Sequence, residues 1–162
     1  MYIKRSLSDK LTVYSCKRLM QHNVNSKKHR YQATVGIGGN IGDVKRRFRH
    51  LFTVLNKEKR VELVRSSLIL KNPPFGYKDQ DDFFNSIMLM RTSMTSKVFL
   101  DYLLRLEKKF GRKRSFANAP RTLDLDIIFF DNIVMDTDKL TLPHASWHKR
   151  ESVVIPLASL VS

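Results

Sequence analysis

The sequence contains very little cysteine. Cys16 is the only cysteine among 162 residues, which excludes an internal disulfide bond and a zinc site built from several cysteines. A single thiol is also typical of proteins in a reducing compartment. We therefore predict a cytoplasmic location.

Long apolar runs are absent as well. No uninterrupted apolar stretch approaches the ~18 residues that a transmembrane helix requires, so we expect neither a membrane span nor a membrane partner. The first 30 residues lack the apolar stretch and small-residue cleavage site of a secretory signal. These absences favour a globular protein, and a length of 162 residues corresponds to about one domain.

Acidic residues are scarce. Fifteen Asp and Glu face thirty Lys and Arg, which gives a net charge of +15. Such a field attracts polyanions, namely nucleic acid, an anionic membrane or a small phosphorylated ligand. Eight of the basic residues fall within residues 1–30, where Asp9 is the sole acid. We predict a basic N-terminal extension over residues 1–31, favoured over a transit peptide, and one domain over residues 32–162.

Apolar spacing predicts the elements of that domain. Apolar residues recur at helical intervals in two segments, and short β-branched or apolar runs indicate strands. Helices are expected at 44–55 and 99–110, and strands at 33–37, 61–70, 83–90, 122–130 and 153–155, with a short return strand at 133–135. This order favours an α+β fold of ferredoxin-like βαββαβ type, with helices packed on a mixed or antiparallel sheet.

The most informative segment for chemistry is Asp124-Leu125-Asp126. Side chains alternate along a strand, so both carboxylates project from one face and repel each other unless a cation compensates them. Magnesium is the cation that hard oxygen ligands favour. From this doublet alone, a magnesium site and a solvated edge strand are equally good interpretations.

A basic loop precedes these carboxylates. Arg112, Lys113, Arg114 and Arg121 all lie within fifteen residues of the pair. Guanidinium groups bind phosphate oxygens through two parallel hydrogen bonds, and carboxylates, magnesium and arginines together are the parts of a phosphoryl-transfer site. A basic surface loop is the plainer alternative, and the combination of both features makes that alternative weaker.

Other features are less specific. The glycine-rich segment at 38–42 fits a tight turn better than a phosphate cradle. His144 and His148 have helical spacing without the glutamate of a zinc-protease motif. Phe83 is more typical of a core than of a stacking platform, but Asn85 behind it presents donors and an acceptor within an apolar run.

Taken together, these segments resemble the 6-hydroxymethyl-7,8-dihydropterin pyrophosphokinase family from about residue 32 to about residue 157. The strongest match is the run Pro120-Arg-Thr-Leu-Asp-Leu-Asp-Ile127. Supporting it are Gly38-Gly-Asn-Ile-Gly42, Pro73-Pro-Phe-Gly76, Phe83-Phe-Asn85, Gly111-Arg-Lys-Arg114 and Leu140-Thr-Leu-Pro-His144.

The resemblance implies transfer of the β,γ-pyrophosphate of ATP to the hydroxymethyl group of the reduced pterin, which releases AMP. It implies that Asp124 and Asp126 hold two magnesium ions, with Arg112 and Arg121 closest to the transferring group. The ATP site it implies comprises Glu107, Arg112, Arg114, Arg121, Ile127, Thr141, His144 and Arg150. The pterin site it implies comprises Asn72, Pro73, Phe75, Phe83, Asn85 and Asp124. ATP and the pterin are the expected partners of a monomer.

Two departures from the family pattern carry expectations of their own. Ser152 stands where an aromatic residue is frequent, which predicts weaker pterin binding. The loop at 112–120 is one residue shorter than in many relatives, and we expect it to close over ATP together with the loop at 71–82. The alternative function is a basic nucleic-acid-binding module, which the carboxylate pair and the missing aromatic RNA-binding motif disfavour.

Overall fold

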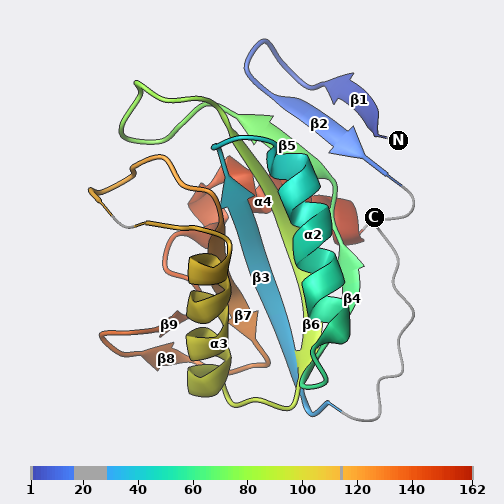
Figure 1. Ribbon diagram of the computed structural model, residues 1–162, viewed down its shortest axis with the longest axis vertical. Helices are drawn as coiled ribbons and strands as arrows, with labels where there is room; N and C mark the ends of the chain where they lie inside the picture. Colours follow the sequence, from blue (N-terminus) through green and yellow to red (C-terminus); the bar gives the residue numbers. More distant parts are fainter. Residues whose placement is uncertain (1, 17–28, 114, 162) are drawn as a thin grey trace.

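The computed structural model describes residues 2–16, 29–113 and 115–161, and its elements are labelled in Figure 1. The strands of the main sheet are β1 (Ile3–Ser6), β2 (Thr12–Ser15), β3 (Tyr31–Gly39), β4 (Val61–Ser66), β5 (Ile69–Asn72), β6 (Phe83–Thr92) and β7 (Asp124–Phe130). The helices are α2 (Val44–Lys57), α3 (Ser96–Lys109), the 3-10 turn η2 (Trp147–Lys149) and α4 (Glu151–Val161). Strands β8 (Met135–Asp136) and β9 (Thr141–Leu142) form a separate small sheet.

The sheet has the ferredoxin-like arrangement. Strands β7, β3 and β6 lie side by side, with β4 and β5 both paired to β6 on its far side. All of these pairings are antiparallel. The α+β class with a ferredoxin-like core is thus confirmed, and the sheet is antiparallel rather than mixed.

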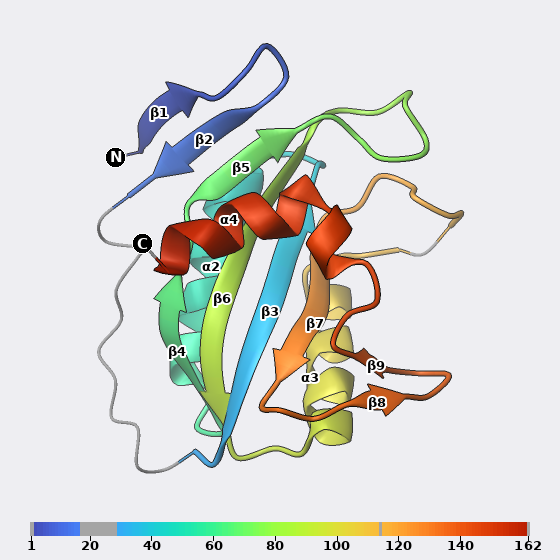
Figure 2. The same cartoon turned by 180° about the vertical axis from the view of Figure 1, so that it is seen from behind.

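Helices cover both faces of the sheet. Figure 1 shows α2 and α3 against one face, and Figure 2 shows α4 crossing the other. The predicted stripes of α2 and α3 are buried against the sheet, with Phe48, Leu55 and Phe99 almost fully inaccessible to solvent. Asp43 caps the N-terminus of α2, because its Oδ1 accepts a hydrogen bond from the backbone N–H of Arg46 at 3.1 Å.

The predicted last strand at 153–155 is wrong, because these residues lie in α4. Their β-branched side chains favour a strand locally, but Val153 and Leu160 pack on Ile87 and Ile128 of the sheet. This packing buries one stripe of a helix, and tertiary packing outweighs the small differences in intrinsic propensity.

Three element boundaries also differ from expectation. The strand expected at 61–70 is two strands, because the backbone leaves the ladder at Ser67, whose Oγ accepts from the Ile87 N–H at 2.7 Å. Gly38 and Gly39 belong to β3 rather than to a turn. The return strand begins at Met135 and pairs with β9, not with β7.

The N-terminal residues form a hairpin on the same sheet. Strand β1 pairs with β2, and β2 pairs with the edge of β5. Figures 1 and 2 both show this hairpin at the end of the sheet that carries the loops. The division of the chain between residues 31 and 32 stays a prediction. In the part of the chain that the structure describes, no helix is long and apolar enough to cross a bilayer.

Candidate functional site

The predicted carboxylate pair lies at the start of β7. Asp124 and Asp126 are two residues apart in this strand and therefore share one face of it. Asp124 is held by two arginines, because its Oδ1 accepts from Arg112 Nη1 at 2.7 Å and its Oδ2 from Arg121 Nη1 at 3.0 Å. The structure thus joins the predicted carboxylates to the predicted basic loop.

Asp126 lies in an environment that disfavours its charge. Burial raises the pKa of Asp126 to about 7, and the negative charges of Asp124 and Glu107 add to this effect. A bound cation would reverse it. The donor set fits magnesium, which takes one or two carboxylates and completes its shell with phosphate oxygens and water. The described residues hold no cluster of three or more His, Cys, Asp or Glu that could enclose a metal by itself.

Glu107 contacts two components of this site. Glu107 is only 3% exposed, and its side chain reaches from α3 to the backbone of β7, where its Oε1 accepts from the Leu125 N–H at 2.8 Å. The same oxygen lies 2.8 Å from Arg112 Nη1. Glu107 therefore fixes both the strand that carries the carboxylates and one of the arginines. Its predicted contact with the nucleoside stays a prediction.

Asn40 is a residue that the sequence analysis missed as a site component. Its Oδ1 accepts from the Arg121 N–H at 2.9 Å, and its Nδ2 donates to Gln80 Oε1 at 2.8 Å and to the Asp81 carbonyl at 3.0 Å. The buried amide ties the end of β3 to both loops and positions Arg121. The sequence feature that could have revealed Asn40 is its position as a polar residue within the glycine-rich segment at 38–42. In the structure, Asn40 connects this segment to the two neighbouring loops.

The residues predicted for the pterin line one cavity of about 640 Å³. Among its lining residues are Asn72, Pro73, Phe75, Phe83, Asn85, Arg121, Asp124, Arg150 and Ser152. A cavity of this volume lies within the range that small-molecule ligands occupy. The structure therefore brings together the residues that the resemblance assigned to the pterin.

Two contacts organise the floor of this cavity. Asn85 Nδ2 donates to Asn72 Oδ1 at 2.7 Å, so the amide is held across strands β5 and β6. Gly38 leaves room for it, because a Cβ at that position would lie 2.7 Å from Asn85 Oδ1. The Arg121 guanidinium carbon lies 5.1 Å from the centre of the Phe83 ring, close enough for a cation–π interaction. Arg121 thus touches both the aromatic wall and the carboxylate Asp124.

The two loops expected to flank the site lie against each other (Figures 1 and 2). Gln80 Nε2 donates to the Asn118 carbonyl at 2.8 Å, and the rings of Tyr77 and Phe116 meet edge to face with centroids 5.2 Å apart. Asn118 also lines the cavity. The described parts of both loops thus border the same site, and their closure over ATP stays a prediction.

The remaining ATP residues are spread around β7. The His144 N–H donates to the Ile128 carbonyl at 2.9 Å, and burial lowers the pKa of the His144 imidazole, with a further lowering from Arg150. Thr141 is exposed on β9, and the Ile127 side chain is buried in the core. Arg114 lies outside the described residues. The ATP roles of these residues stay predictions.

Comparison with known proteins bears directly on this arrangement. Residues 34–162 match the family described as 7,8-dihydro-6-hydroxymethylpterin-pyrophosphokinase (HPPK). The chain belongs to this family. It is 41% identical over 136 residues to the 2-amino-4-hydroxy-6-hydroxymethyldihydropteridine pyrophosphokinase of Campylobacter jejuni, covering 84% of this chain and 87% of the relative.

Two further relatives have names that also refer to this activity or to folic acid synthesis. The Helicobacter pylori protein of the same name is 36% identical, over 78% of this chain and 79% of the relative. The folic acid synthesis protein FOL1 of Dictyostelium discoideum is 29% identical over 88% of this chain, which corresponds to 22% of its own length. The resemblance inferred from the motifs is thereby confirmed.

Proposed function

We propose that this HPPK-family chain transfers pyrophosphate from ATP to the hydroxymethyl group of 6-hydroxymethyl-7,8-dihydropterin, giving AMP and the pterin diphosphate of folate biosynthesis. One observation carries the proposal. Arg121 connects Asp124, at 3.0 Å, with the Phe83 ring, at 5.1 Å. A phosphate-binding arginine and a metal-binding carboxylate thus border an aromatic cavity, as transfer between a nucleotide and a flat heterocycle requires.

The cavity supplies the recognition of the pterin. Phe83 offers an aromatic face to the flat ring, and stacking on such a face contributes about 1–3 kcal/mol per base. Asn85 and Asn72 offer amide donors and acceptors to the polar edge of the ring. Their mutual hydrogen bond of 2.7 Å fixes the orientation of both groups before the ligand arrives, which lowers the entropic cost of binding.

The arginines supply the recognition of the triphosphate. In the chain alone, Arg112 and Arg121 are paired with Asp124. We infer that both guanidinium groups exchange this carboxylate for phosphate oxygens when ATP binds, since both anions match their planar donors. Asp124 is then free to bind a cation together with Asp126. Asp124 and Asp126 would hold magnesium, two ions by the family resemblance, and the bound metal would neutralise charge on the transferring phosphates.

The chemical step needs little more than positioning. The pterin hydroxyl attacks the β-phosphorus, the bond from that phosphorus to the bridging oxygen of the α-phosphate breaks with AMP as the leaving group, and the hydroxyl proton passes to solvent. Holding both reactants in line and stabilising developing charge provide most of the rate in such transfers. Asn40 and Glu107 contribute indirectly, because they position Arg121 and Arg112.

Product identity tests this proposal. Incubation with magnesium, ATP and the dihydropterin should give AMP and the pterin diphosphate. Asp124→Ala should abolish both products, whereas Asp138→Ala should retain full activity, since Asp138 is an exposed carboxylate in the turn between β8 and β9. Formation of ADP, or AMP formation that is independent of the pterin, would contradict the proposal.

The family assignment favours this function over the nucleic-acid-binding alternative. The acidic face of β7 supports the same choice, because carboxylates repel a phosphate backbone. The cytoplasmic location and the monomeric state stay predictions.

A further inference from the structure

We propose that the tip of the N-terminal hairpin forms one wall of the pterin cavity and that Leu11 is a binding residue for the pterin ring. This inference rests on the proposed function. The hairpin precedes residues 34–162, the region that matches the family. Yet three residues of its tip, Ser8, Lys10 and Leu11, line the same cavity as Phe83 and Asn85.

The hairpin is attached to the strand that carries part of the pterin site. Val13 of β2 lies opposite Leu70 of β5, and Thr12 lies opposite Lys71. Asn72 is the next residue of β5. Because β2 continues the sheet beyond β5, the backbone of the hairpin is fixed in register with the floor of the cavity. Val13 is only 4% exposed, so the attachment also buries apolar surface.

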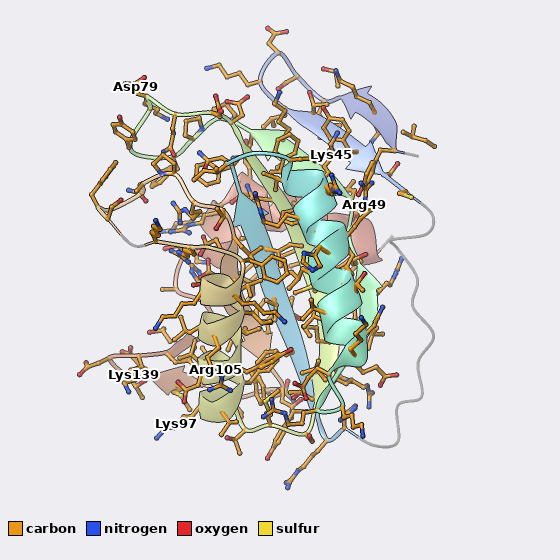
Figure 3. All side chains as sticks on the ribbon, viewed as in Figure 1. Lys45, Arg49, Asp79, Lys97, Arg105 and Lys139 are labelled. Atoms are coloured by element: carbon orange, nitrogen blue, oxygen red, sulfur yellow. The ribbon has the colours of Figure 1, made fainter. Side chains whose placement is uncertain are left out.

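Helix α2 provides a second attachment. Figure 3 shows Lys45 and Arg49 on the side of α2 that faces the hairpin. The Lys45 Nζ lies 4.0 Å from the centre of the Tyr14 ring, and the Arg49 guanidinium carbon lies 5.9 Å from the centre of the Tyr2 ring. Both distances are within the range of cation–π contacts. The hairpin is therefore held from two elements of the domain.

The tip itself is shaped by its own hydrogen bonds. The Ser8 Oγ accepts from the Leu11 N–H at 3.1 Å and from the Lys10 N–H at 3.3 Å. The Leu7 N–H donates to the Leu11 carbonyl at 2.9 Å. These bonds define the tip without a ligand. A wall that is already formed binds a ligand without an added cost of ordering.

The chemistry of the tip complements the rest of the cavity. Ser152 also lines this cavity, at the position where an aromatic residue is frequent in the family, and its small polar side chain contributes little apolar surface. Leu11 is partly buried and adds apolar surface to the same cavity. Lys10 adds a positive charge to a lining that already includes Arg121 and Arg150. An apolar wall suits the pterin ring, and added positive charge suits the diphosphate of the product.

Steady-state kinetics of the full-length chain test this proposal. Leu11→Ser should raise the KM for the dihydropterin about tenfold, which corresponds to about 1.4 kcal/mol. The kcat and the KM for ATP should stay within twofold of the unmodified chain. Leu7→Ser is the matched control, because Leu7 is an exposed leucine of the same tip that does not line the cavity. All three constants should stay within twofold for this control.

A second variant, which removes a charge from the tip, tests the proposal independently if Leu11→Ser lowers the melting temperature. Lys10→Met should weaken binding of the pterin diphosphate roughly threefold at low salt, within the range of exposed charge interactions. Lys4→Met in β1 should not. The proposed role of the hairpin would be overturned if folded Leu11→Ser and Leu7→Ser had equal KM values for the pterin. It would also be overturned if the two lysine variants bound the product with equal affinity. Either result would leave the proposed function unaffected. A lack of pterin-dependent AMP formation by the unmodified chain overturns the proposed function as well.

Discussion

The support that Glu107 gives to the site leads to a quantitative prediction about stability. Glu107 is buried, and its Oε1 accepts from the Leu125 N–H at 2.8 Å. Glu107→Ala removes that acceptor and leaves the backbone N–H without this partner, at a cost of about 1–3 kcal/mol. Glu107→Gln keeps an amide oxygen at the same place, loses the charge and replaces the second carboxylate oxygen by an NH2 group.

The charge itself acts in both directions. Removing it weakens the contact with Arg112, which keeps its ion pair with Asp124 at 2.7 Å. Removing it also relieves the repulsion that raises the pKa of Asp126. Both variants lose the charge, so the effect of the charge itself cancels in the comparison. The difference in unfolding free energy between Glu107→Ala and Glu107→Gln therefore reports the loss of the oxygen that Leu125 and Arg112 share, together with the loss of packing, and we expect about 2 kcal/mol.

Guanidinium unfolding of metal-free protein at pH 7.5, followed by circular dichroism, measures this difference. The midpoint should fall further for Glu107→Ala than for Glu107→Gln while the slope m is unchanged. In thermal unfolding the two variants should differ by roughly 4–8 °C, as a chain of this length gives about 2–4 °C per kcal/mol. A difference under about 0.5 kcal/mol would refute the role of Glu107 as the acceptor that anchors β7.

Three further predictions follow from other parts of the structure. Burial lowers the pKa of His144, so its imidazole should titrate below 6.5 by NMR. The stability it contributes is complete above the unfolded-state pKa of 6.5 and is lost as the pH falls from there through the lower folded-state pKa. An NMR midpoint at or above 6.5 would contradict this. Gly39→Ala should lower the unfolding free energy by about 1–3 kcal/mol, because its Cβ would lie 2.5 Å from the Thr122 carbonyl oxygen. Gly36→Ala is the control, since its nearest neighbour lies at 3.5 Å, and equal urea midpoints would count against the argument. Ser152→Phe should tighten pterin binding roughly tenfold by adding an aromatic face to the cavity, and an unchanged dissociation constant in calorimetry would exclude that face.

Local sequence determined most of the helices and strands. Helical apolar spacing located α2 and α3 because each helix must bury one stripe on the sheet. The strand pattern of Asp124-Leu125-Asp126 predicted that the two carboxylates share a face, because side-chain alternation is a property of the strand itself. The motif around these carboxylates also identified the family, and with it the cavity residues that the structure brings together.

Tertiary structure decided the features that depend on distant partners. The segment at 153–155 has strand-forming side chains, yet it is helical because Val153 packs on the far face of the sheet. Asn40 positions Arg121 across 81 residues of sequence. The hairpin tip reaches the cavity only because β2 extends the edge of β5. Such contacts leave no periodic trace in the sequence, because the energy that fixes them comes from groups that meet only when the chain has folded.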